Sequence, residues 1–257
     1  MLGISEGGYG TEVLSTRMTD RLAAVSAMAC GSGSSIHVEN LRNLPFRTGV
    51  GEKDSAFGRV TNARKNHLRL EELRQQDPQG YVNLLDEQKG RGHGIDYKPG
   101  PAWMIDFTRK THPERVVLTT YRADKKRNDS AYWLQITKDL GERDLYLDAK
   151  VDKAANAIEI KAEATAAEAK YQSPDWQQAL VDPGALVPAK GLKLRLWLHE
   201  SLIDFSKPLI VKINGKEVSK GKVPPGLKSM MESLQRHGDP QRIYPAFLDV
   251  EVDTVSP

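Results

Sequence analysis

Cysteine is almost absent from the 257-residue chain, which contains only Cys30. One cysteine excludes an internal disulfide, and its apolar surroundings (AVSAMAC) are typical of a small core residue rather than a nucleophile. No stretch has the ~18 apolar residues that a membrane-spanning helix needs, and the chain does not begin with the basic flank and apolar segment of a signal peptide. The net charge of +3 is too small to indicate nucleic-acid binding. We therefore expect neither a membrane nor a nucleic acid as a partner.

Motifs for metals and common cofactors are missing too. The histidines, cysteine and acidic residues do not occur at metal-ligand spacings, and no P-loop or dinucleotide-binding fingerprint is present. We therefore expect no metal and no cofactor.

The hydrophobic pattern changes character near the middle of the chain. Up to about residue 110, short apolar runs alternate with helical patterns, as in α/β proteins. From Pro113 onward the apolar residues recur every second position between turn signals, which is typical of a β-sandwich of immunoglobulin or fibronectin type. We therefore predict an α/β domain over 1–112 and an all-β domain over 113–257, with the boundary between Lys110 and Arg115.

Each region has its own set of expected elements. The first should contain helices over 9–18, 60–76 and 101–109, and strands over 21–30, 46–50 and 81–85. The second should contain strands over 115–121, 131–137, 144–151, 157–163, 192–199, 209–213 and 242–252, with a short helix within 224–237. Asn214-Gly215 predicts a two-residue hairpin, because both residues tolerate the positive φ that such a turn needs.

The segment Gly3-Ile4-Ser5-Glu6-Gly7 has the G-x-S-x-G spacing of a nucleophile elbow, in which a sharp turn between strand and helix exposes a serine. The spacing alone is weak, since it arises by chance in about one chain in ten of this size. Gly8 and a predicted helix follow directly, as an elbow requires. The competing interpretation is a chance match.

An acid and a histidine follow the serine in the order that α/β hydrolases use. Asp54 lies just past the predicted strand 46–50, where a flexible loop could present a catalytic carboxylate, although a helix cap or loop carboxylate is an equally good interpretation of Asp54 alone. His93 lies in the glycine-rich segment Gly90–Gly94, which lets an imidazole reach across to another strand. We therefore expect Ser5, Asp54 and His93 to converge at one edge of a parallel sheet.

Three segments together resemble a known family. GISEGGYGTEVLSTRMTDRLAAVSAMACG, VGEKDSAFGR and GRGHGIDYKPGPAWM are similar to the C-terminal part of bacterial α/β-hydrolase-fold serine esterases of the dienelactone-hydrolase or prolyl-oligopeptidase kind. The resemblance covers residues 1 to about 110, and the β-rich remainder is less specifically similar to a tail that such proteins carry. They are often exported, but the sequence does not fix the compartment.

The resemblance implies a mechanism for a small-molecule carboxylic ester. Ser5 would be the nucleophile, His93 the base and Asp54 the acid, and the backbone N–H of Glu6 would be one oxyanion donor. Because α/β hydrolases place several strands before the elbow, the resemblance also implies a partial sheet, a missing second oxyanion donor and weak or absent activity of the chain as it stands. Self-association that covers the exposed sheet edge is a further expectation.

Two other functions remain open. The chain could be a non-catalytic remnant whose β-sandwich is a binding or assembly module, or a serine peptidase of prolyl-oligopeptidase type. The sequence does not distinguish ester from peptide substrates.

Overall fold

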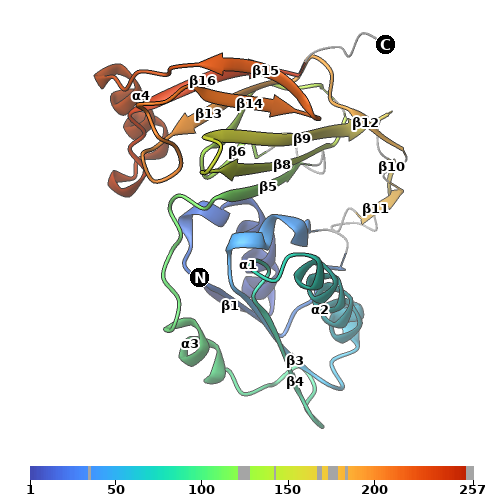
Figure 1. The fold of residues 1–257 in the computed structure, drawn as a ribbon. Coiled ribbons are helices and arrows are strands. Elements are labelled where there is room, and N and C mark those ends of the chain that lie inside the picture. Colours follow the sequence, from blue (N-terminus) through green and yellow to red (C-terminus); the bar gives the residue numbers. More distant parts are fainter. Residues whose placement is uncertain are drawn as a thin grey trace. The chain divides into compact units, whose positions relative to one another are not determined.

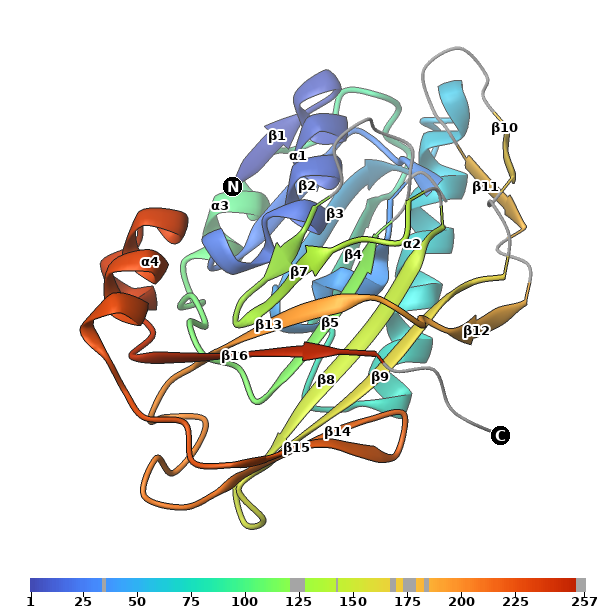
Figure 2. The same cartoon turned by 90° about the horizontal axis from the view of Figure 1, so that it is seen from above.

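A computed structural model describes residues 1–33, 36–120, 128–141, 143–166, 170–172, 179–182 and 185–252 (Figures 1 and 2). The chain divides into two compact units. One contains Met1–Lys110 together with Lys170–Val181, and the other contains Thr111–Ala169 and Asp182–Pro257. Strands β10 (Lys170–Gln172) and β11 (Ala179–Asp182) pair with each other. None of the helices in the described ranges combines the length and the apolar character needed to cross a membrane.

The first unit is built on a parallel sheet with the strand order β1-β2-β3-β4 (Figure 2). Its strands and α-helices are β1 (Leu2–Ile4), α1 (Glu6–Arg17), β2 (Val25–Met28), β3 (Phe46–Gly51), α2 (Arg59–Gln76), β4 (Asn83–Gln88) and α3 (Pro99–Met104). Short 3-10 helices are η1 (Thr19–Arg21), η3 (Val38–Asn43) and η4 (Ala56–Gly58). Because all four strands run the same way, the loops that follow them emerge at one edge of the sheet.

The alternation of side chains along β2 explains how helices cover both faces of this sheet. Val25 and Ala27 point to one face, where they share a buried cluster with residues of α1 and α2. Met28 belongs to the opposite face, which α3 approaches so closely that a Cβ on Gly100 would lie 2.9 Å from the Met28 sulfur. Helices α1 and α2 therefore cover one face of β2, and α3 lies against the other face.

Within its described residues, the second unit contains two sheets (Figure 1). The first is a six-stranded mixed sheet with the strand order β15-β14-β9-β8-β5, in which β12 also pairs with β9. The second is a four-stranded antiparallel sheet with the order β16-β13-β7-β6. Its elements are β5 (Arg115–Thr120), β6 (Ser130–Ala131), β7 (Leu134–Lys138), β8 (Leu145–Asp152), β9 (Ala157–Thr165), β12 (Leu186–Pro188), β13 (Lys193–Leu198), β14 (Leu209–Ile213), β15 (Lys216–Gly221), α4 (Leu227–His237), the 3-10 helix η5 (Pro240–Arg242) and β16 (Ala246–Glu251). One hydrophobic cluster with Trp133 and Trp197 at its centre takes side chains from both sheets.

The expected fold class is wrong. The chain is a mixed α/β protein with a parallel, a mixed and an antiparallel sheet and few helices, not an α/β-hydrolase domain followed by an all-β sandwich. The mixed sheet arises because β14 pairs in parallel with β9, with Val211 opposite Ile158. Period-two patterning shows which residues face the core, but it does not distinguish a parallel neighbour from an antiparallel one.

Several individual elements agree with the sequence-based expectation. Helix α2 covers Arg59–Gln76 against the expected 60–76, and β14 covers the expected 209–213. The Asn214-Gly215 hairpin is confirmed, with φ values of 50° and 83° at the two residues. The apolar run expected as a strand over 21–30 is a strand only over Val25–Met28, and the helix expected over 101–109 is the shorter α3.

Candidate active site

Ser5 lies at the sharp turn between β1 and α1. It is the residue before the helix, with φ 56° and ψ −116°, and it is one of the few non-glycine residues with positive φ in the described chain. Such a conformation costs energy and persists only where the surroundings fix it. Here the Ser5 N–H donates to the Met28 carbonyl at 2.8 Å, and the Ser5 carbonyl accepts from the Tyr9 N–H at 3.1 Å.

Two of the glycines around Ser5, Gly3 and Gly8, are required by close packing. A Cβ on Gly3 would lie 2.0 Å from the Gly7 carbonyl oxygen, and one on Gly8 would lie 2.5 Å from the Met28 carbonyl oxygen. A Cβ on Gly7 would meet no atom within 4 Å. The backbone of Gly7 must nevertheless pass beside Gly3, so the turn brings the start of α1 directly onto the end of β1. These contacts are the steric reason for small residues at a nucleophile elbow.

The structure brings Ser5, His93 and Asp54 together in one hydrogen-bonded chain. His93 Nε2 lies 3.0 Å from Ser5 Oγ, and His93 Nδ1 lies 2.8 Å from Asp54 Oδ2. The three residues follow β1, β4 and β3, whose carboxyl ends meet at the same edge of the parallel sheet. Two other acids near His93 in sequence have different partners: Asp86 is paired with Arg47, and Asp96 accepts the Lys98 N–H at 3.0 Å.

The loop that carries His93 is tied to the loop after β3. Lys53 N–H donates to the Arg91 carbonyl at 2.8 Å, and Gly90 N–H donates to Glu52 Oε2 at 2.7 Å. The two backbones approach so closely that a Cβ on Gly51 would lie 2.0 Å from the Gly92 carbonyl oxygen. These contacts anchor the glycine-rich loop that carries His93 to the loop that carries Asp54, so the loop does not move freely.

Asp54 is buried and held from both sides. Its side chain is 3% exposed, whereas the His93 side chain is 45% exposed. Arg59 Nη1 donates to Asp54 Oδ1 at 2.7 Å, which leaves Oδ2 to His93. The buried carboxylate is therefore paired with a fixed cation as well as with the imidazole, and its orientation is set by a residue at the start of α2. Sequence reasoning missed Arg59, because an arginine five residues after an aspartate is not a distinctive signal.

A second buried carboxyl group lies beneath the turn, on α1. Glu12 is 0% exposed, and its Oε2 accepts hydrogen bonds from the Ser32 N–H, at 2.8 Å, and from the Ser32 hydroxyl. Burial raises the pKa of Glu12 to about 7, although the two Ser32 hydrogen bonds favour the ionised form. The same burial, with Glu12 nearby, raises the pKa of the Cys30 thiol. Glu12 was also missed from the sequence, where it is one acid among ordinary helix residues.

The expected oxyanion donor occupies a suitable place in the chain. Glu6 is the first residue of α1, so its N–H has no acceptor four residues earlier within the helix. Its side chain is exposed, and the backbone group rather than the carboxylate is the relevant feature. The described residues include no group of three or more His, Cys, Asp or Glu side chains that could hold a metal ion.

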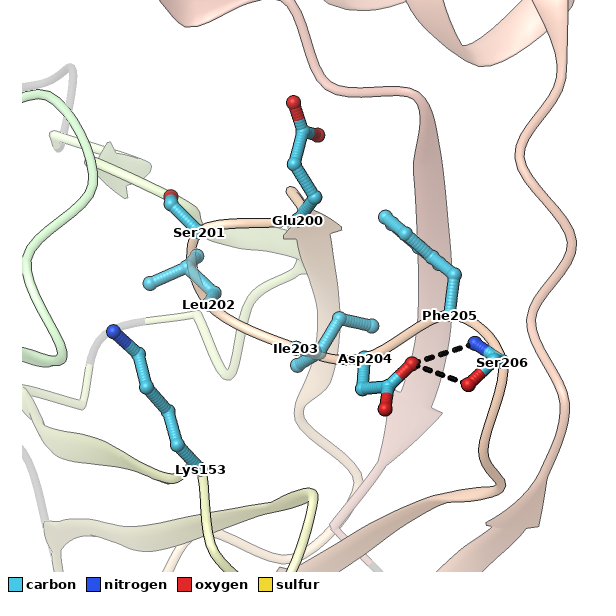
Figure 3. A pocket seen from close by; sticks show the side chains of 8 residues that line it. All are labelled: Lys153, Glu200, Ser201, Leu202, Ile203, Asp204, Phe205 and Ser206. Carbon is cyan, nitrogen blue, oxygen red and sulfur yellow. Dashed lines mark hydrogen bonds between the residues drawn. The ribbon is translucent and has the colours of Figure 1, made fainter.

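A separate hollow of about 710 Å³ lies in the second unit, where the loop 200–206 faces Lys153 (Figure 3). Ser201, which lines this hollow, makes a second serine–histidine contact, with its Oγ 2.9 Å from His199 Nδ1. That nitrogen also accepts the backbone N–H of Ser201 at 3.1 Å, which makes the pair part of a local turn. Asp204 accepts hydrogen bonds from the N–H and the hydroxyl group of Ser206, and these bonds lower the pKa of Asp204 to about 2. These side chains hold the shape of their own loop.

Comparison of the chain with protein families, with curated proteins and with solved structures finds no match. Inferences about chemistry therefore depend on the geometry of Ser5, Asp54 and His93.

Proposed function

We propose that the first unit is a serine hydrolase that acts on carboxylic esters, with Ser5 as nucleophile, His93 as general base and Asp54 as the acid that orients His93. The observation that carries the proposal is the pair of contacts on the two imidazole nitrogens, 3.0 Å to Ser5 Oγ and 2.8 Å to Asp54 Oδ2. A serine in a strained turn after a strand, bonded to a histidine that is bonded to a buried carboxylate, is the arrangement that activates a hydroxyl group.

In this mechanism His93 Nε2 takes the proton of Ser5 Oγ as the oxygen attacks the ester carbonyl. Asp54 accepts the hydrogen bond of His93 Nδ1–H, selects the tautomer with a basic Nε2, and stabilises the imidazolium that forms. The alcohol leaves with the proton from His93. Water then attacks the acyl-enzyme and gives a proton to His93, and the carboxylic acid leaves as His93 returns that proton to Ser5 Oγ.

The Glu6 N–H would stabilise the negative charge that develops on the carbonyl oxygen. As a first-turn amide of α1 it points along the helix axis, and the positive end of the helix dipole adds to its effect. The half-exposed His93 ring favours a substrate that reaches the serine from solvent. The similarity of the three motifs to bacterial serine esterases supports ester chemistry. The fold of the whole chain is not the α/β-hydrolase domain with an all-β sandwich that the similarity implied.

The direct test is labelling with a fluorophosphonate probe, which reacts with activated serines. The wild-type protein should be labelled on the peptide that contains Ser5, as identified by mass spectrometry. Ser5→Ala should abolish this labelling, and His93→Ala should slow it by at least about 10³-fold. Turnover of p-nitrophenyl esters should fall in parallel, and comparison with p-nitroanilides distinguishes an esterase from a peptidase.

Ser201→Ala is the matched control, because Ser201 also has a histidine nitrogen close to its hydroxyl group. It should be labelled as fast as wild type. Absence of labelling in the folded wild-type protein would contradict the proposal and favour a non-catalytic module. Labelling that persists in Ser5→Ala but disappears in Ser201→Ala would place the reactive serine in the second unit.

A further inference from the structure

A hollow of about 350 Å³ in the first unit is lined by helix α2 and by residues that lead into the 3-10 helix η3, which packs against α2. Helix α2 contributes four polar side chains at positions i, i+3, i+4 and i+7, which form one stripe along the helix: Asn62, Lys65, Asn66 and Arg69. A helix that packs on a core normally has apolar side chains at this spacing. The polar stripe therefore needs a separate explanation.

Asn66 has a buried amide group without a hydrogen-bond partner. The residue is 6% exposed and lies among the residues that α2 buries, which include Ala63 and Leu70. In the described ranges of the chain, its Nδ2 has no acceptor. A buried amide donor is normally paired, because an unpaired one costs stability. Since Asn66 also lines the hollow, an acceptor atom that enters the hollow would provide the missing partner.

Lys65 adds a positive charge to the stripe. Its side chain is exposed, and among the described residues no acid is paired with it. The acid that lines the hollow, Glu39, is instead paired with Arg69 at 3.1 Å, and Arg69 is paired with Glu72 as well, at 3.2 Å. An anion in the hollow would therefore find the ammonium group of Lys65 available.

The wall opposite α2 supplies apolar surface. Ile36 and Val38 line the hollow and are 5% and 4% exposed. His37 lies between them, and its burial lowers its pKa to about 4, so its imidazole is neutral at neutral pH and adds no charge. Apolar surface with a few polar groups is typical of sites for small organic molecules, and the volume is near the lower limit of about 300 Å³ for such sites.

Contacts within the protein fix the end of the hollow at the loop after β2. Asn62 Nδ2 donates to the Gly31 carbonyl at 3.0 Å, and a Cβ on Gly33 would lie 2.9 Å from Asn62 Oδ1. Gly33 has φ 55°, a conformation that favours glycine. This end of the hollow is thus formed without a ligand, as is usual for small-molecule sites.

We infer that this hollow binds a small organic anion, whose carboxylate or phosphate oxygens accept the Asn66 N–H and pair with Lys65. Its carbon skeleton lies against Ile36 and Val38. One anionic group provides both the acceptor that Asn66 lacks and the charge that Lys65 lacks, and hydrogen bonds to a charged partner are the strong ones. The inference is independent of the triad, because no residue of the triad lines this hollow.

Isothermal titration calorimetry of the full chain with succinate and with glycerol 3-phosphate tests this inference. Wild type should bind at least one of them saturably, and the tighter one identifies the anionic group. The neutral analogues succinamide and glycerol should bind about tenfold or more weakly, because the charged hydrogen bonds are lost. Lys65→Gln should weaken binding about tenfold for the same reason. Asn66→Leu should weaken it at least as much without lowering stability in urea, because leucine removes the unpaired amide at similar volume.

Arg64→Gln is the matched control, because it removes one positive charge from the neighbouring position of α2, where Arg64 is paired with Glu87 and does not line the hollow. It should bind the anions as wild type does. Absence of saturable binding of both anions to the folded wild type would overturn the inference, as would equal binding by Lys65→Gln and Arg64→Gln. Asn66→Leu that is destabilised in urea, with anion binding unchanged in Lys65→Gln, would assign the stripe a structural role instead.

Discussion

Glu12→Gln should remove a defined part of the pH dependence of the first unit's stability. Each unit of pKa shift corresponds to 1.36 kcal/mol, so raising the pKa of Glu12 from 4.5 to about 7 corresponds to about 3 kcal/mol. Below pH 4.5 the carboxyl group is protonated in both the folded and the unfolded chain, and it makes no pH-dependent contribution. As pH rises from 4.5 to 7, the unfolded chain releases the proton while the folded chain retains it, so the wild-type protein loses stability.

The glutamine variant has no proton to lose and keeps an oxygen that can accept the Ser32 hydrogen bonds. The difference in unfolding free energy, variant minus wild type, should therefore rise by about 3 kcal/mol between pH 4.5 and pH 7 and remain constant above that. Taking this difference removes the contribution of groups common to both proteins. One such group is His37, because its burial lowers its pKa to about 4.

Cys30 provides the assay, since it is the only cysteine of the chain and is 0% exposed in the same unit. Its labelling in a urea series by dithiodipyridine, which reacts at low pH, reports unfolding of the first unit separately from the second. A difference between the two proteins that is independent of pH, or that falls as pH rises, would refute the reasoning. Such a result would mean that Glu12 is ionised in the folded state at neutral pH.

Three further predictions concern the same unit. Arg59→Met should slow fluorophosphonate labelling of the candidate nucleophile about 10- to 100-fold by releasing the buried acid, whereas Arg64→Met, which removes an exposed ion pair, should not change it. In urea unfolding, Gly8→Ala should destabilise the unit by about 1–3 kcal/mol, because the added Cβ would clash with the Met28 carbonyl. Gly10→Ala should instead stabilise α1 by about 0.5–1 kcal/mol, because the space around its Cβ is open. His37→Gln should abolish the loss of up to about 3 kcal/mol expected as pH falls from 6.5 to 4, because the buried neutral imidazole resists protonation.

The proximity of Asp54 and His93 could be anticipated from the sequence because each residue follows a predicted strand. Ser5 is grouped with them by its glycine spacing and its order along the chain, whereas strand β1 (Leu2–Ile4) before it is not predicted. Apolar runs before Asp54 and His93 indicate buried strands, and the glycines beside Ser5 and His93 indicate tight backbone turns. In a parallel sheet the loops that follow the strands lie at the same edge, so residues in these loops are expected to lie close together. The Asn214-Gly215 turn was predictable for a similar local reason, since its two positive φ values depend on the two residues themselves.

The residues that support the site could not be anticipated in this way. Arg59 contacts Asp54 because the 3-10 helix η4 turns the chain back, and this turn includes Phe57 with φ 54°, which its residue type does not favour. Glu12 meets Ser32 across 20 residues of sequence. The Arg59 contact depends on an unusual local turn and the Glu12 contact on tertiary placement. In the sequence, an arginine or a glutamate in a helix looks the same whether its partner is buried or it faces solvent.

The error in fold class and the exposure of four apolar side chains on α4 have a common physical origin. These side chains are Leu227, Met230, Met231 and Leu234. A hydrophobic period identifies an element and its two faces, but what covers each face is decided by the rest of the chain. Strand β14 has the alternation of a half-buried strand, yet its neighbour β9 is parallel. Helix α4 has a clear apolar face, yet the face that packs against the unit contains Ser229 and Ser233. Where the packed face and the apolar face of a helix differ, as on α4, the hydrophobic pattern of the sequence identifies the helix but not the face that packs on the unit.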